Sequence, residues 1–103
     1  MKCIVKINNK NNIDKYTSLC DGFIIGLKDY SVGFSDSFSL EDIKALKENS
    51  KKEIFVSINK NMFNSELDSL LDILKELESI KINGILFYDL SILYLVKKND
   101  INI

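Results

Sequence analysis

DGFII, residues 21–25, and NGILF, residues 83–87, are two copies of one pattern: a turn-forming pair, Asp-Gly or Asn-Gly, followed by a run of apolar residues. Apolar runs of this kind, rich in Ile, Phe and Val and bounded by Gly or Asn, are typical of β-strands. The pattern predicts strands at Phe23–Leu27 and Ile85–Tyr88, and similar runs predict strands at Cys3–Ile7 and Ile54–Ile58. The last three strands begin about 30 residues apart, which is the length of one βα unit.

Amphipathic helices are predicted between these strands, each with an N-cap residue that can accept a hydrogen bond from the helix N-terminus. The N-caps and buried stripes are Asn12 with Ile13, Tyr16, Leu19 and Cys20; Ser39 with Leu40, Ile43 and Leu46; and Ser65 with Leu67, Leu70, Leu71, Leu74 and Leu77. Asp42, three residues after Ser39, predicts a capping box. The last helix, Ser91–Lys98, is apolar on nearly every side and is therefore expected to be covered on every side.

Apolar strands that alternate with amphipathic helices favour a parallel sheet covered by helices. The first turn, residues 8–12, contains no glycine, which disfavours a nucleotide-binding fold and favours part of a (β/α) barrel. Ile101–Ile103 have the pattern of the start of a fifth strand. The sequence thus predicts an α/β protein: one domain, residues 1–103, forming a TIM-barrel-like parallel (β/α) half-barrel of about four βα units plus a fifth strand.

Composition narrows the chemistry that the chain can perform. It has 103 residues, a net charge of −1, 14 basic residues that are all lysine, and no histidine. The balanced charge gives no electrostatic footprint for DNA, RNA or anionic lipid. Without histidine, Ser-His and Cys-His nucleophile pairs are excluded, as are zinc sites that need His. We predict no metal site.

The two cysteines, Cys3 and Cys20, follow no metal or redox motif, and we predict buried, reduced thiols rather than a disulfide. The N-terminal apolar stretch is too short and too charged for a signal peptide, and no run approaches membrane-spanning length. The expected location is the cytoplasm.

Five segments, taken in order, resemble one known family. They are Asp21–Gly26, Phe38–Ile43, Ile54–Asn59, Leu74–Leu77 and Gly84–Asp89. They resemble the N-terminal half of the collagenase-like peptidases, peptidase family U32, whose catalytic type is unassigned. In that family a strand ending in Gly leads through a long loop to a Phe-Ser-Leu-Glu-Glu helix, a Val-Asn ending closes strand 3, and an Asp closes strand 4. The similarity is closer over residues 21–103 than over residues 1–20.

The resemblance implies a TIM-like barrel. It also implies either peptidase activity or a role in hydroxylating RNA bases or quinones, for which some members carry an iron–sulfur cluster. The cysteines and basic residues associated with those activities lie in the second half of the family's barrel, and Cys3 and Cys20 match none of them. We therefore expect no cofactor in this half.

Ligand sites of (β/α) barrels lie at the C-terminal ends of the strands, on the loops that follow them. The longest such loop here, residues 26–38, contains three aromatic rings. Tyr30 can serve as a pocket wall, whereas Phe34 and Phe38 are better explained as a plug of the barrel mouth. The predicted ligand contacts are Lys28, Tyr30, Asn59, Asn61 and Asp89, and no catalytic residue is assigned. Each has a structural alternative: solvation for Lys28, turn formation for the two Asn residues, and capping of the last helix for Asp89.

The function predicted from the sequence is the N-terminal half-barrel of a collagenase-like peptidase homologue that binds a peptide or small molecule and is inactive alone. One alternative is a non-catalytic interaction domain that forms a homodimer through its open sheet edges. The other, implied by the resemblance, is part of a protein of the same family that hydroxylates RNA bases or quinones. The expected partner is a second copy of the chain or a missing C-terminal half-barrel. For the homodimer we expect Ile92, Leu93, Leu95 and Val96 and the terminal strands to form the contact.

Overall fold

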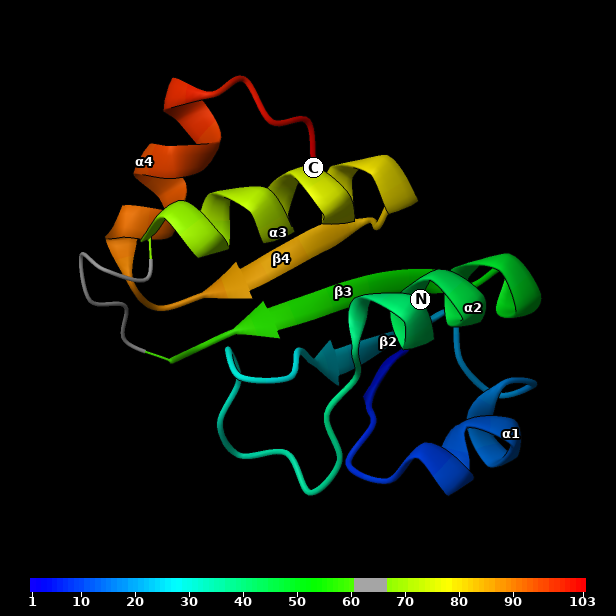
Figure 1. Cartoon of the computed structure of the whole chain (residues 1–103). Helices are drawn as coiled ribbons and strands as arrows, with labels where there is room; N and C mark the ends of the chain where they lie inside the picture. Colours follow the sequence, from blue (N-terminus) through cyan, green and yellow to red (C-terminus); the bar gives the residue numbers. More distant parts are fainter. Residues whose placement is uncertain (61–66) are drawn as a thin grey trace.

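Four parallel strands lie side by side in chain order in the computed structural model, which describes residues 1–60 and 67–103 (Figure 1). They are β1 (Ile4–Lys6), β2 (Gly22–Gly26), β3 (Glu53–Ile58) and β4 (Gly84–Phe87). Every neighbouring pair is parallel. Since parallel neighbours need a crossover, each connection between strands includes a helix.

The helices are α1 (Ile13–Tyr16), preceded by a 3-10 turn at Lys10–Asn12, then α2 (Leu40–Ser50), α3 (Leu67–Ile80) and α4 (Leu90–Lys98). The main covering helices are α2 and α3, which lie over the sheet in Figure 1, while α4 follows β4 near its end. The predicted alternation of strands and helices is therefore confirmed.

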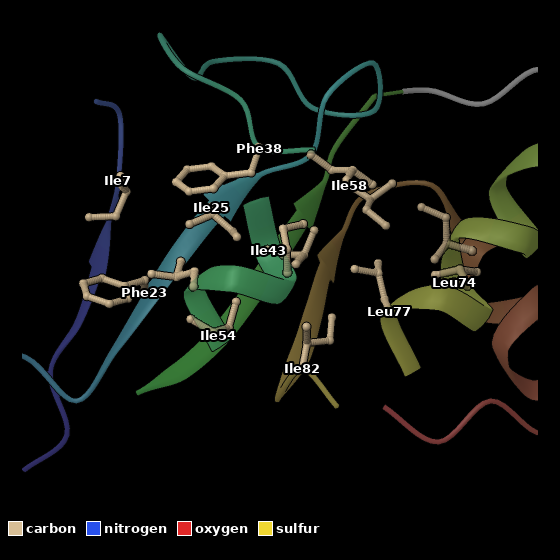
Figure 2. Packing of buried hydrophobic residues seen from close by; sticks show 14 of the residues in the cluster. Ile7, Phe23, Ile25, Phe38, Ile43, Ile54, Ile58, Leu74, Leu77 and Ile82 are labelled. Carbon is tan, nitrogen blue, oxygen red and sulfur yellow. The ribbon is translucent and has the colours of Figure 1, made fainter. Parts of the chain in front are cut away.

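One face of the sheet forms the core with the helices (Figure 2). Side chains alternate along a strand, so every second residue points to the same face. The fully buried strand residues on the helix side are Phe23, Ile25, Ile54, Val56 and Ile58, and they pack with Ile43 of α2 and with Leu70, Leu74 and Leu77 of α3. Leucine at the predicted α3 positions therefore forms the helix side of the core.

The opposite face, which we call the open face, consists of Ile4, Lys6, Ile24, Phe55, Ser57 and Leu86. Of these residues only Ser57 is buried, and the exposed fraction of Leu86 is 44%. In a (β/α) barrel the face turned away from the helices lines the barrel interior. The four-stranded parallel sheet is thus consistent with half of such a barrel, in which the open face would correspond to the barrel interior.

The repeated Asp-Gly and Asn-Gly pairs hold the bases of neighbouring strands together. The Asp21 N–H donates to the Cys3 carbonyl at 2.7 Å, and the Asp21 Oδ2 accepts from the Cys3 N–H at 2.7 Å. Asn83 repeats this with Ile54, at 2.8 Å for its N–H and 2.9 Å for its Oδ1. An Asp or Asn side chain can therefore accept a hydrogen bond from a strand N–H that precedes the backbone hydrogen bonds between the two strands.

The glycines of the two pairs allow close packing on the open face. A Cβ atom at Gly22 would lie 2.7 Å from the Glu53 carbonyl oxygen, and one at Gly84 would lie 2.9 Å from the Phe55 ring. Both distances are shorter than van der Waals contact. The two pairs thus have two roles. The Asp or Asn side chain links neighbouring strands at their N-terminal ends, and the glycine leaves room for the residue beside it on the next strand.

The structure differs from the sequence-based expectations at the first helix and at the thiols. Asn9, not Asn12, provides the side-chain cap, because Asn12 is already helical and its side chain accepts no capping hydrogen bond. The first helix is a single turn that leaves Leu19 74% exposed. Cys20 is buried as expected, but Cys3 is exposed, so its predicted burial is wrong.

The C-terminal segment also differs. Residues 101–103 form no strand, and the Asn102 N–H instead donates to Glu78 of α3. Ile101 is buried in the core cluster. In α4 the side chain of Ile92 is buried within the chain, so it is not available to a partner, whereas Leu93 is 40% exposed. The N-cap predicted at Ser65 lies outside the described residues.

The predicted capping box of α2 is confirmed: Ser39 Oγ accepts from the Asp42 N–H, and Asp42 Oδ2 accepts from the Ser39 N–H, both at 3.1 Å. The Ser39 backbone N–H, and then the Lys10 ammonium 3.0 Å from Oδ2, hold the pKa of Asp42 below its ordinary value.

Asp42→Asn is expected to lower the free energy of unfolding by about 1 kcal/mol at neutral pH, because the cap and the charge are weakened. A depressed pKa stabilises the fold above the pKa of the unfolded chain, and this contribution is lost as the pH falls through the folded pKa. Urea unfolding at pH 7 and at pH 3 measures the difference between wild type and variant, which should shrink at pH 3. An equal difference at both pH values would contradict a role for the charge.

Candidate functional site

The loop between β2 and α2 leaves the sheet at its C-terminal edge and returns to the same point. The Phe38 N–H donates to the Gly26 carbonyl at 2.7 Å, and the Lys28 N–H donates to the Phe38 carbonyl at 3.0 Å. Leu27 and Phe38 form a parallel bridge there. Residues 28–37 therefore form a loop whose two ends are paired, above the C-terminal ends of the strands (Figure 1). Ligand sites of (β/α) barrels lie at this end.

Two side chains fasten this loop to β3. The Ser31 hydroxyl accepts from the Leu27 N–H at 2.7 Å and donates to the Ser57 carbonyl. The Asn59 amide pairs with both backbone groups of Val32: Oδ1 accepts from the N–H at 2.6 Å, and Nδ2 donates to the carbonyl at 2.9 Å. The Asn59 side chain thus makes with Val32 the pair of hydrogen bonds that the backbone of a neighbouring strand would otherwise make.

The loop is also fastened to the end of β1. The Asp36 N–H donates to the Asn8 carbonyl at 2.9 Å, and Asp36 Oδ2 accepts from the Lys10 N–H at 2.7 Å. Lys6 donates from Nζ to the Gly33 carbonyl at 3.0 Å, and the same ammonium lies 4.5 Å from the centre of the Phe34 ring. These contacts fix the position of the Phe34 ring over the sheet.

A hollow of about 260 Å³ lies at the C-terminal end of the open face. We call it the mouth hollow; it is lined by Lys6, Ile24, Phe34, Ser57, Asn59, Leu86, Phe87 and Tyr88. Gly26 makes room for the Phe34 ring, because a Cβ atom there would lie 2.7 Å from the ring. Apolar walls with a few polar groups, here an ammonium, an amide and two hydroxyls, are typical of small-ligand sites.

Of the four predicted site residues that the structure describes, only Asn59 lines the mouth hollow. Tyr30 is half-buried and packs against the core, and Lys28 is exposed at the base of the loop. Asp89 caps α4, with Oδ1 accepting from the Ser91 N–H at 2.9 Å. Asn61 lies outside the described residues. The structure therefore does not bring Asp89 together with Asn59 at the mouth hollow.

Lys6, Ser57, Leu86 and Tyr88 line the hollow but were not expected from the sequence. Lys6 and Ser57 lie within strands rather than on the loops after them. The signal that could have found them is alternation: counting by twos along each strand puts Lys6, Ile24, Ser57 and Leu86 on the face that does not pack with the helices.

Another hollow, of about 390 Å³, lies on the helix side of the fold between α1 and α2. Its lining includes Lys10 and Asp42, which form an ion pair, and the buried Phe38. Because this hollow lies between helices rather than at the C-terminal end of the open face, we assign the candidate site to the mouth hollow. Residues 1–60 and 67–103 contain no cluster of three or more His, Cys, Asp or Glu side chains suited to a metal ion. None of the helices in these ranges has the length and hydropathy needed to cross a membrane.

Comparison with known proteins adds one match. The family model described as peptidase family U32 matches residues 10–103. No curated protein and no solved structure matches the chain.

Proposed function

The chain belongs to peptidase family U32, and on that premise we propose that it is the N-terminal half of a TIM-like barrel whose mouth hollow binds part of a peptide or small-molecule ligand. The observation that supports this proposal is the position of the hollow: it lies at the C-terminal end of the inner face, below a loop fixed by Ser31, Asn59 and Asp36. Active sites of (β/α) barrels occupy that end.

Within the mouth hollow, the side chains have different roles in binding. Ile24, Phe34 and Leu86 offer apolar contact, and the Tyr88 ring, 80% exposed, can stack on a ligand. Lys6 presents an ammonium beside the Phe34 ring, where it can meet a carbonyl or an anionic group. The described lining includes no carboxylate that could act as a general base, so we expect binding without peptide hydrolysis by this half alone.

A titration of the isotope-labelled chain with gelatin-derived peptides, followed by backbone NMR, tests this function. We expect shifts at Lys6, Phe34 and Tyr88, and no cleavage of fluorogenic gelatin above the buffer rate. Tyr88→Ala should weaken binding roughly 3–10-fold, the effect of losing one stacked ring. The matched control is Tyr94→Ala, which removes an exposed ring from α4. Shifts absent from the mouth at millimolar peptide would contradict the proposal.

A second candidate function, a homodimerising interaction domain, is favoured by exposed apolar side chains that continue from the open face into the following segment of the chain. Leu86, Tyr88 and Leu90 are 44%, 80% and 73% exposed and follow one another along the end of β4 and the start of α4. Exposed apolar groups that are contiguous usually mark an interaction site. Both candidates are compatible, since a partner that covers the open face would also close the mouth hollow.

A further inference from the structure

We propose that β1 of a second copy of this chain pairs with the outer edge of β4, and that β4 of the second copy pairs with β1 of the first, so that two copies close one eight-stranded barrel. This rests on the proposed half-barrel function and names the partner of its open face. It also specifies which residues meet and which part of the mouth hollow the second copy supplies.

The two edges of the sheet are compatible. In the order β1-β2-β3-β4, β1 and β4 each have one strand neighbour among the described residues, and both run in the same direction. Unpaired backbone groups on such edges are a template for another strand. A two-fold axis along the barrel joins β4 to β1 twice with parallel strands, and therefore leaves no edge open.

Apolar space is available beside β4 for the strand that would pair with it. A hollow of about 190 Å³ lies between β4 and α4, lined by Ile85, Phe87, Ile92, Leu93, Val96, Lys97 and the C-terminal Ile103. A strand added at this edge places every second side chain under α4. The β1 segment has Cys3, which is exposed, and Val5, which is half-buried, at such alternate positions. They suit this space in size and polarity.

The register follows from the observed sheet. Lys6, Ile24, Phe55 and Gly84 form one continuous row across the four strands. An eight-stranded barrel of this class has a shear of 8, so the row shifts by about four residues over half the barrel. Gly84 therefore faces Lys2 of the second copy, Ile85 faces Cys3, Leu86 faces Ile4, and Tyr88 faces Lys6. A shift in the other direction would pair Gly84 with Lys10, which lies in a 3-10 turn rather than in a strand.

This register has a consequence for the mouth hollow. Lys6 of the second copy comes to lie beside Tyr88, which follows the C-terminal end of β4. Tyr88, 80% exposed in one copy, gains a neighbour, and each mouth is completed by a lysine from the partner copy.

Cysteine cross-linking of the full chain tests the register. Adjacent strands lie roughly 4.8 Å apart, within the Cα separation that a disulfide can span. Under mild oxidation, Ile85→Cys should link to the native Cys3 of the second copy and run as a covalent dimer on a non-reducing gel. Ile85→Cys combined with Cys3→Ser should remain a single chain. A matched control, Lys44→Cys on the exposed side of α2, should link no more than wild type does.

A second pair of cysteines tests the same register on the open face rather than in the core. The double variant Leu86→Cys with Ile4→Cys should also form a disulfide between two copies. Light scattering of wild type at tens of micromolar should give twice the mass of the chain. A monomer at this concentration, or a dimer that forms neither cross-link, would overturn the proposed closed dimer. A ladder of higher oligomers would overturn it too, because it would mean that copies join edge to edge without closing. Since the peptide titration can succeed in each of these cases, failure of the pair is distinguishable from failure of the ligand site.

Discussion

Replacing Phe23 by alanine is expected to lower the free energy of unfolding by about 3–5 kcal/mol, the cost of removing a buried aromatic ring. Phe23 is fully buried on the helix-side face of β2, between β1 and β3 (Figure 2). Its neighbours in the register, Val5 and Ile54, belong to separate strands and cannot both move to fill the space. Urea unfolding followed by circular dichroism measures the change.

The matched control is Tyr94→Ala, which removes a ring that is 61% exposed on α4. A surface substitution of this kind is expected to change the free energy by about 0.5 kcal/mol or less. Since domains of this size have roughly 5–15 kcal/mol of stability, Phe23→Ala should leave a large unfolded fraction on mild heating. A loss as small as that of Tyr94→Ala would contradict the assigned core.

Asn83→Ala is expected to lower the free energy of unfolding by about 1–3 kcal/mol, because it removes the acceptor of a part-buried strand N–H. Asn83 Oδ1 accepts from the Ile54 N–H at 2.9 Å and from Lys47 Nζ of α2 at 2.8 Å. The hydrogen bond to the Ile54 N–H is part-buried, so water replaces the lost acceptor only incompletely. Hydrogen exchange at Ile54, together with urea unfolding, measures the effect.

Two companion variants sharpen this test. Asn83→Asp keeps the acceptor oxygen, as Asp21 does at the equivalent position before β2, and should retain most of the stability. Asn49→Ala removes an exposed amide from α2 and should be nearly neutral. If Asn83→Asp were as damaging as Asn83→Ala, the acceptor would not be the important part of the side chain.

The elements of the fold could be predicted from the sequence because each had a local signal. The strands followed from short apolar runs, α3 from leucines at helical spacing, and the start of α2 from Ser39 and Asp42. The first helix could not be placed correctly, because Asn9 and Asn12 are chemically equal as caps and the choice between them depends on the backbone angles. At Asn9 the backbone is extended, whereas at Asn12 it is already helical.

Much less of the candidate site could be predicted. Asn59 was expected because it directly follows a strand, and it does line the mouth hollow. Its amide, however, is paired with Val32, which depends on how a loop 27 residues earlier folds back. Lys6 was missed because its position at the mouth depends on the register between β1 and β2. Asp89 could be assigned either to a ligand or to the helix, and only the geometry showed that it caps α4.

The agreement between strand order and chain order has a consequence for how the protein is made. Each strand pairs with the one synthesised just before it, so a ribosome-bound chain can add βα units one at a time as they emerge. None of the four described strands has to wait for a partner from the far end of the sequence, which keeps the entropy cost of each closure small. Folding can therefore begin at the N-terminus, with β1 and β2 serving as the template on which β3 and then β4 assemble.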